Sequence, residues 1–186
     1  MNRITVWAIA AMMALLGGAM AQSGRYGIGR TATPEEIRRR DISVAPDGSG
    51  LPTGHGAVTK GRAVYEERCA NCHGNRGEGS PPYPALVGGR GTLASRDPVL
   101  TVGSYWPYAT TVWDYIHRTM PYSRPGSLST AETYEVTTFI LYLNGIVDER
   151  ADLNEKTLPQ VKMPNREGFV GDPRPDVGKE QRKSKD

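Results

Sequence analysis

Hydrophobic residues recur at helical spacing most clearly in the segment STAETYEVTTFILYLNG, residues 129–145. The apolar positions follow the i, i+3, i+4, i+7 pattern of one helix face, at Val136, Phe139, Ile140 and Leu143. Ser129 followed by Glu132 is a capping-box sequence, and Asn144-Gly145 is a typical helix stop. The pattern predicts a core helix here.

Two further segments have a less regular helical pattern. Residues 59–69 place a group of side chains on one face, at Gly61, Val64, Tyr65 and Arg68. Residues 108–119 do the same at Tyr108, Val112, Tyr115, Ile116 and Thr119, and this pattern stops at Met120-Pro121. No alternating strand pattern persists, so the sequence predicts an all-α fold with three main helices.

Glycine and proline dominate the rest of the chain. The 186 residues include 22 Gly and 14 Pro, a composition that leaves room for few regular elements. The long stretch of turns after residue 73 must wrap around something, since a loop of that length usually has a functional reason. We expect a domain at residues 58–146, long irregular arms at 22–57 and 147–178, and a disordered tail at 179–186.

The first 21 residues have the parts of a secretory signal peptide. Arg3 precedes an apolar run over residues 4–16, and Ala19-Met20-Ala21 is a small-residue cleavage site. The apolar run is shorter than the roughly 20 residues that a membrane-spanning helix needs. We expect cleavage before Gln22, a mature chain in the periplasm and no stable membrane insertion.

Charge is nearly balanced, with 23 Lys and Arg against 20 Asp and Glu. The basic residues cluster only in IRRRD and GKEQRKSKD and form no coherent stripe. This distribution argues against a nucleic-acid partner.

The two cysteines of the chain lie in the segment RCANCHG, residues 68–74. A thioredoxin-like dithiol would need a βαβ setting, and a zinc site would need a second pair of ligands. A disulfide between Cys69 and Cys72 would close almost no loop and would stabilise little. Cys-x-x-Cys-His is the sequence of covalent c-type haem attachment, in which both thiols bind the haem and His73 binds its iron.

The iron of such a haem needs a second axial ligand. Met120 precedes Pro121 just upstream of the terminal helix, so its loop can fold back over the face opposite His73. His117 is the alternative and is otherwise an exposed helical histidine, and His55 is a further candidate. Met163 falls in a Pro-rich tail where nothing is expected to hold it. A thioether ligand favours ferrous iron and suits electron transfer.

Residues 58–146 resemble class I cytochrome c. The resemblance rests on a helix ending in Cys-x-x-Cys-His-Gly, the Met120-Pro121 loop and a terminal helix with YLNG. It implies that Gly61 and Tyr65 cross the terminal helix near Phe139 and Tyr142. It further implies a set of haem contacts: Pro84 accepting the imidazole N–H, Leu86 packing on the haem, and Arg90, Trp106 and Tyr108 near the propionates.

A resemblance over nearly the whole mature chain is to the SoxD-type cytochrome subunits of sulfane dehydrogenase. It rests on TVGSYWPYATTVWDYIHRTMPY and on LPQVKMPNREGFVGDPRPD, together with the segment before the domain. It implies a periplasmic molybdenum-cofactor catalytic subunit as electron donor and a soluble cytochrome c as acceptor. The chain has one haem motif where some members have two, which leaves sulfane and sulfite both open as the substrate.

The arms separate two hypotheses on function. Both arms carry isolated apolar residues that are candidates for partner contacts: Tyr26, Ile28, Ile42, Val44, Leu158, Val161, Met163, Phe169 and Val170. Such segments can wrap a partner surface and order on binding. A dedicated electron-transfer subunit would use them, whereas the alternative, a free monohaem shuttle, would not. A short helix capped by Thr33 and Glu36 is expected in the N-terminal arm.

Overall fold

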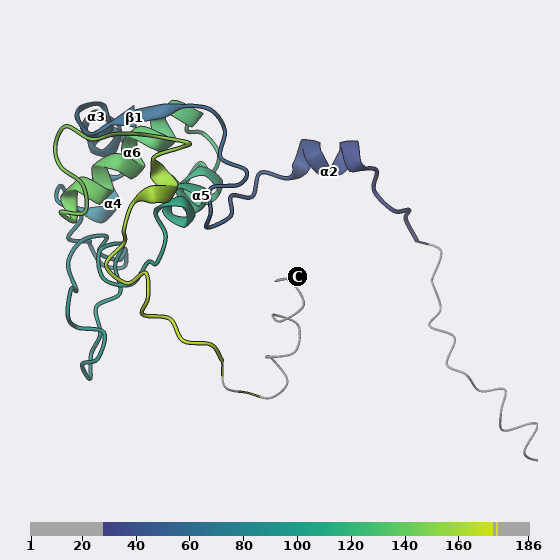
Figure 1. Ribbon diagram of the computed structural model, residues 1–186. Coiled ribbons are helices and arrows are strands. Elements are labelled where there is room, and N and C mark those ends of the chain that lie inside the picture. Colours follow the sequence, from purple (N-terminus) through teal and green to yellow (C-terminus); the bar gives the residue numbers. More distant parts are fainter. Residues whose placement is uncertain (1–27, 173, 175–186) are drawn as a thin grey trace, which may run out of the picture. The chain divides into compact units, whose positions relative to one another are not determined.

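The computed structural model describes residues 28–172 and 174 (Figure 1). The predicted signal peptide, Tyr26 and the predicted tail at 179–186 lie outside the described residues. The chain separates into two units, residues 1–41 and 42–186, which we describe one at a time. None of the helices in the described part is both long and apolar enough to cross a bilayer.

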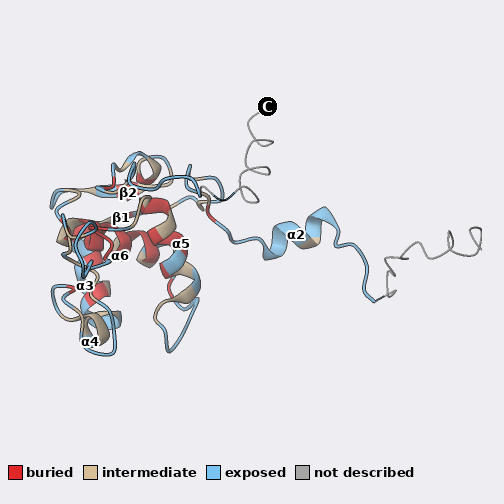
Figure 2. Cartoon of the chain, turned by 90° about the horizontal axis from the view of Figure 1, so that it is seen from below, coloured by how far each residue is buried: buried red, intermediate tan, exposed pale blue. Residues whose placement is uncertain are grey.

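The described part of the first unit contains helix α2, Pro34–Arg40, which forms where it was expected. The Thr33 hydroxyl accepts a hydrogen bond from the Glu36 N–H, and the Glu36 carboxylate accepts one from the Thr33 N–H, which completes the capping box. Acidic residues occupy the first turn and arginines the last, the arrangement that complements the helix dipole. No residue of α2 is buried (Figure 2).

Helix α6, Thr130–Leu143, is the core element of the second unit and contacts α3, α5 and both strands. Helix α3, Val58–Arg68, crosses it at Gly61. A Cβ atom at Gly61 would lie 1.9 Å from the main-chain oxygen of Glu135, so only glycine allows this approach. The rings of Tyr65 and Phe139 meet at 5.3 Å. The predicted crossing of the first and last helices is therefore confirmed.

Helix α5, Ala109–Thr119, packs on α6 by a different face from the one expected. Val112 and Ile116 are buried as predicted, but Tyr115 is 45% exposed and Trp113 is fully buried in its place. The Trp113 ring packs against that of Tyr134 on α6. The expected face was wrong here because the buried face runs through Ala109, Val112, Trp113 and Ile116, and Tyr115 points away from it, two residues after Trp113.

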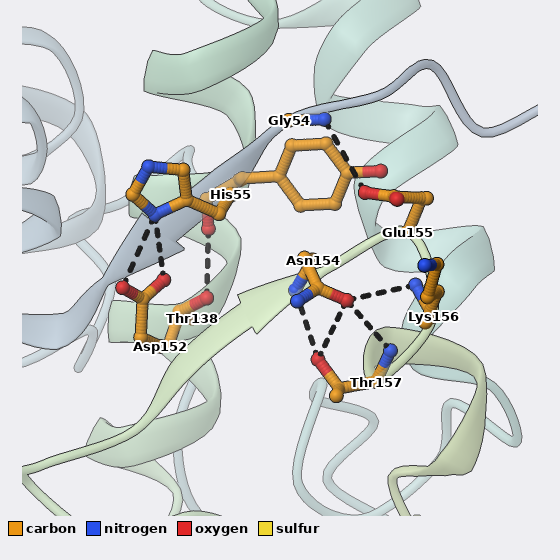
Figure 3. Close-up of polar contacts among 9 residues, drawn as sticks. Gly54, His55, Thr138, Asp152, Asn154, Glu155, Lys156 and Thr157 are labelled. Atoms are coloured by element: carbon orange, nitrogen blue, oxygen red, sulfur yellow. Dashed lines mark hydrogen bonds and ion pairs between the residues drawn. The ribbon is translucent and has the colours of Figure 1, made fainter.

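The C-terminal arm contains regular structure that the sequence pattern did not predict. Strand β2, Asp152–Asn154, pairs antiparallel with β1, His55–Ala57, and a 3-10 helix, η1, follows at Leu158–Gln160. We call residues 152–160, which contain β2 and η1, the strap. Figure 3 shows its polar contacts: His55 Nδ1 lies 3.0 Å from Asp152, and the Asn154 side chain accepts hydrogen bonds from the main-chain N–H groups of Lys156 and Thr157.

The apolar residues of the arms differ in how far they are buried. Three of the expected partner contacts, Val44, Leu158 and Met163, are buried in this domain's own core. The expectation was wrong for them because both arms fold back on the domain: the Val44 N–H donates to Asp114 on α5, and β2 and η1 of the C-terminal arm contact α6 and α5. Val161 is partly buried against the same core, and four others remain exposed, at Ile28, Ile42, Phe169 and Val170. Of the described candidates, these four are the most available to a partner.

Candidate functional site

The Cys-x-x-Cys-His motif sits at a break between two helices. Helix α3 ends at Arg68, and Cys69 has a non-helical conformation that starts the single turn of α4, Ala70–His73. The Cys69 carbonyl accepts hydrogen bonds from the N–H groups of Cys72, at 3.1 Å, and of His73, at 3.0 Å. Residues three and four apart share one face of such a turn. Both thiols are free, so the structure contains no disulfide between them.

The core holds this turn in place through Tyr65. Its hydroxyl donates a hydrogen bond of 2.8 Å to the carbonyl of Gly74, directly after the motif. Burial, with a smaller contribution from the neighbouring Cys72, raises the pKa of the Cys69 thiol to about 11. Cys69 is therefore a neutral thiol at neutral pH, as expected for a sulfur on the edge of an apolar core.

The orientation of His73 is set by Pro84. Nδ1 of His73 lies 2.9 Å from the Pro84 carbonyl oxygen. A carbonyl oxygen can only accept, so this contact assigns the proton to Nδ1 and leaves the Nε2 lone pair free for a metal ion. The contact that the resemblance implied is thus present in the structure, and the role of His73 as an iron ligand remains a proposal.

The candidate second ligands occupy four different environments. Met120 caps the C-terminal end of α5 and packs against the core while half-buried. His117 is not the exposed histidine that was expected, because its ring stacks on Trp113 at 4.7 Å. Met163 is 3% exposed within the core, so the expectation that nothing holds it was wrong. His55 pairs with Asp152 on the strap. Of these four residues, Met120 remains the proposed second ligand of the iron.

The remaining predicted haem contacts are found in varied surroundings. Leu86 and Trp106 are partly buried against the core. The Tyr108 ring lies under the guanidinium of Arg166, at 4.4 Å. Arg90 donates through Nη2 to the main-chain oxygen of Asn144, at 2.7 Å, which occupies one of its five N–H groups. Contacts of these residues with propionates remain proposals.

The residues around the motif supply both the donor atoms and the apolar surface that a haem needs. Two free thiols and an imidazole with a free Nε2 are the donor set of a covalent haem c. A group of apolar side chains packs on the core and keeps part of its surface exposed, a lining suited to a large apolar ring: Ala70, Leu86, Trp106 and Met120. When bound, the haem iron supplies one-electron redox chemistry.

The sequence pattern did not indicate one buried contact of this region, which Asn144 makes. Asn144 was interpreted only as part of a helix stop, yet its side-chain amide donates to the carbonyl of Leu86 at 3.1 Å. No periodic signal reports such a contact, because it joins residues that are 58 positions apart. A helix-ending Asn is common for local reasons alone, so its residue type does not indicate a distant partner.

Comparisons with known proteins bear on the family of this chain. The cytochrome c family model matches residues 58–144. Thiosulfate dehydrogenase of Psychrobacter arcticus is 28% identical over 112 residues, which is 55% of this chain and 32% of that protein. Thiosulfate dehydrogenase of Stutzerimonas stutzeri is 30% identical over 113 residues, 58% of this chain and 33% of that protein. The matches span about a third of the length of these curated relatives.

A solved structure gives a more extensive likeness. A chain in the crystal structure of the sulfane dehydrogenase SoxCD from Paracoccus pantotrophus is 46% identical, with a TM-score of 0.74. The likeness covers 86% of this chain and 78% of that chain. This chain therefore belongs to the cytochrome c family: it is an electron-transfer protein with covalent haem c, related to SoxD, the cytochrome subunit of SoxCD.

Proposed function

We propose that this chain is the electron-accepting subunit of a periplasmic sulfane or sulfite dehydrogenase. Its partner in this proposal is a molybdenum-cofactor catalytic subunit, which oxidises the sulfur substrate. The haem of this chain receives the electrons and passes them to a soluble cytochrome c. Export by the predicted signal peptide at residues 1–21 belongs to the same proposal, since it would bring the chain to the periplasm.

The observation that carries the proposal is the extent of the likeness to the SoxCD chain. The cytochrome c family model covers residues 58–144, less than half of the chain, whereas the 46% identity extends over 86% of it. The likeness therefore reaches well beyond the part that every c-type cytochrome needs. Segments outside the haem domain are what a subunit with a dedicated partner would keep.

Within the proposal, each site residue has one role. Cys69 and Cys72 would form the thioether links, and His73 and Met120 would bind the iron. Leu86 would pack against the ring, while Arg90, Trp106 and Tyr108 would contact its propionates. An iron held by two protein side chains would leave a substrate no coordination position, so these residues would support electron transfer and not catalysis at the iron.

An exposed apolar surface offers a docking site for the partner. The rings of Tyr105 and Phe169 meet edge to face at 5.2 Å, and they are 40% and 52% exposed. Asn165 donates to the Tyr105 carbonyl and, with Leu93, lines an adjoining hollow of about 340 Å³. Exposed apolar groups that gather in this way mark interaction surfaces. Because this surface lies partly on the C-terminal arm, it supports a dedicated partner over a free shuttle.

The identity of the co-purifying chain tests the proposal. We expect the affinity-tagged protein, isolated from its native host under native conditions, to retain a molybdenum protein in stoichiometric amount. Adding a sulfane or sulfite substrate to that complex should reduce the haem, and the isolated cytochrome should stay oxidised under the same conditions. Isolation as a lone monohaem protein that many donors reduce equally would favour the free shuttle instead.

The docking surface has its own test. Phe169→Asp places a charge in the exposed ring contact without touching the core, so we expect it to weaken co-purification of the molybdenum subunit. Glu66→Arg, a change of charge at another exposed position, on α3, is the control and should leave co-purification intact. Deleting residues 147–186 would be a poor test, because Leu153, Leu158 and Met163 belong to the core.

The axial ligand is tested by spectroscopy. Met120→Ala should remove the sulfur-to-iron charge-transfer band of the ferric protein, because no thioether would then reach the iron. Met163→Leu keeps the volume of a buried core side chain and should leave that band unchanged. The opposite pattern would transfer the ligand role to Met163.

A further inference from the structure

Asn144 is a buried polar residue that joins three separate parts of the domain. It ends α6 and is 9% exposed. Its Nδ2 donates to two carbonyls, that of Ile140 in its own helix at 2.9 Å and that of Leu86 at 3.1 Å. Both partners are acceptors, so the orientation of the amide is unambiguous. Its main-chain oxygen accepts from Arg90.

The other side of the amide is enclosed by Gly103. A Cβ atom at Gly103 would lie 2.1 Å from Asn144 Oδ1, so glycine is the residue that leaves room for the amide. The amide is therefore held in one rotamer by packing as well as by hydrogen bonds. This degree of enclosure exceeds what a helix stop requires, since the bond to Ile140 alone would serve that purpose.

Leu86, the distant partner of Asn144, lies two residues after Pro84, the residue that orients His73. Both main-chain polar groups of Leu86 are engaged: its N–H donates to Gly77 at 2.8 Å, and its carbonyl accepts from Asn144 and from Val102. The Gly77 segment returns to the motif, because the Gly79 N–H donates to the His73 carbonyl at 2.8 Å. Two hydrogen bonds, Asn144 to Leu86 and His73 to Pro84, are thus joined by the short backbone segment from Leu86 to Pro84, and together they connect α6 to the imidazole.

We propose that Asn144 is a positioning residue for the proximal histidine: it holds the Leu86 segment so that the Pro84 carbonyl stays in hydrogen-bond contact with His73 Nδ1. The inference rests on the role of His73 as the iron ligand in the proposed function. A carbonyl on Nδ1–H raises the basicity of the imidazole and thereby stabilises ferric iron. Loosening this carbonyl should make the haem easier to reduce.

The test uses the full-length holoprotein with ¹⁵N-labelled histidine. Asn144→Ser retains a hydroxyl that can bond to Ile140, four residues earlier, but is too short to reach Leu86. We expect solvent exchange of the His73 Nδ1 proton to accelerate about fivefold, as for the loss of one hydrogen bond, and the midpoint potential to rise. Thr138→Val is the control, because it removes a buried hydrogen bond in α6 that has no connection to the loop, and both readouts should stay at wild-type values.

A second variant reaches the same contact without changing Asn144. Gly103→Ala would displace the amide by its Cβ, and we expect the same two shifts. Wild-type exchange and potential in either folded variant would overturn the proposal and leave Asn144 a structural residue. Failure of the proposed function would give a different result: if His73 does not bind the iron, its ring protons in the wild-type ferric protein will lack the large contact shifts of a coordinated imidazole.

Discussion

Helices α2 and α6 begin with the same local signal and lie in opposite surroundings. In each, a hydroxyl residue caps the first turn and a glutamate three residues later bonds back to the cap, Thr33 with Glu36 and Ser129 with Glu132. Yet α2 has no buried residue, whereas α6 has eight. A capping box determines where a helix starts, and burial determines how much the fold depends on that helix.

The difference lies in the residues after the cap. The seven residues of α2, PEEIRRR, contain a single large apolar side chain, Ile37, so this helix has no apolar face to bury. The fourteen residues of α6, TAETYEVTTFILYL, carry apolar side chains on most sides of their C-terminal half. A helix like α2 has no apolar face to pack on the core of its own domain. A helix like α6 can pack against several other elements of its domain.

The largest expected effect tests this contrast directly. Leu141→Ala in α6 empties a fully buried position and should lower the free energy of unfolding by about 2–5 kcal/mol. Ile37→Ala in α2 changes a side chain that is 54% exposed and should change that free energy by less than about 0.5 kcal/mol. Denaturant unfolding of the holoprotein measures both. Equal losses would mean that α2 belongs to the cooperative core.

A second effect concerns the packing of α6 against α3. Gly61→Ala would bring a Cβ against the Glu135 main-chain oxygen, which cannot rotate away, and should cost about 1–3 kcal/mol of unfolding free energy. Gly171→Ala is the matched control, because a Cβ there would meet no atom within 4 Å. A thermal melt without change for Gly61→Ala would show that the two helices separate at no cost.

The two capping boxes provide a smaller and closely matched comparison. Ser129→Ala removes the hydroxyl that accepts the Glu132 N–H and should lower the global unfolding free energy by roughly 0.5–2 kcal/mol. Thr33→Ala removes the equivalent bond in α2 and should leave global unfolding unchanged, with only local loss of helix. Amide exchange separates local from global opening. A global loss in Thr33→Ala would contradict the comparison.

The features that could be predicted from the sequence are the ones with local signals. Both capping boxes, the helix before Cys69 and the terminal helix lie where their residue patterns place them. The haem motif was equally accessible, because its chemistry requires three residues at fixed spacing. In each case the side chains that carry the signal lie within one or two helical turns of each other.

The features that could not be predicted depend on distant partners. Strands β1 and β2 are three residues long, too short for a periodic pattern, and they bring together residues 97 positions apart, such as His55 and Asp152. The burial of Trp113 in place of Tyr115 likewise results from packing between elements, as does the contact of Asn144 with Leu86. Single-sequence patterns report a helix face but not which neighbour will cover it.

The smallest expected effect is the pH dependence of the two caps. The Ser129 main-chain N–H lowers the pKa of Glu132, and Arg30, with Thr33, lowers the pKa of Glu36 to about 2. Both carboxylates therefore stabilise their helices above the pKa of the unfolded chain, and this contribution is lost as the pH falls through the lower folded value. Unfolding curves between pH 6 and pH 3 should show that Glu132→Gln removes a small part of the acid sensitivity, about 0.5 kcal/mol. Glu36→Gln should leave the pH dependence of global unfolding unchanged, because α2 contributes no residue to the buried core. An equal change in both variants would show that the two helices unfold as one cooperative unit.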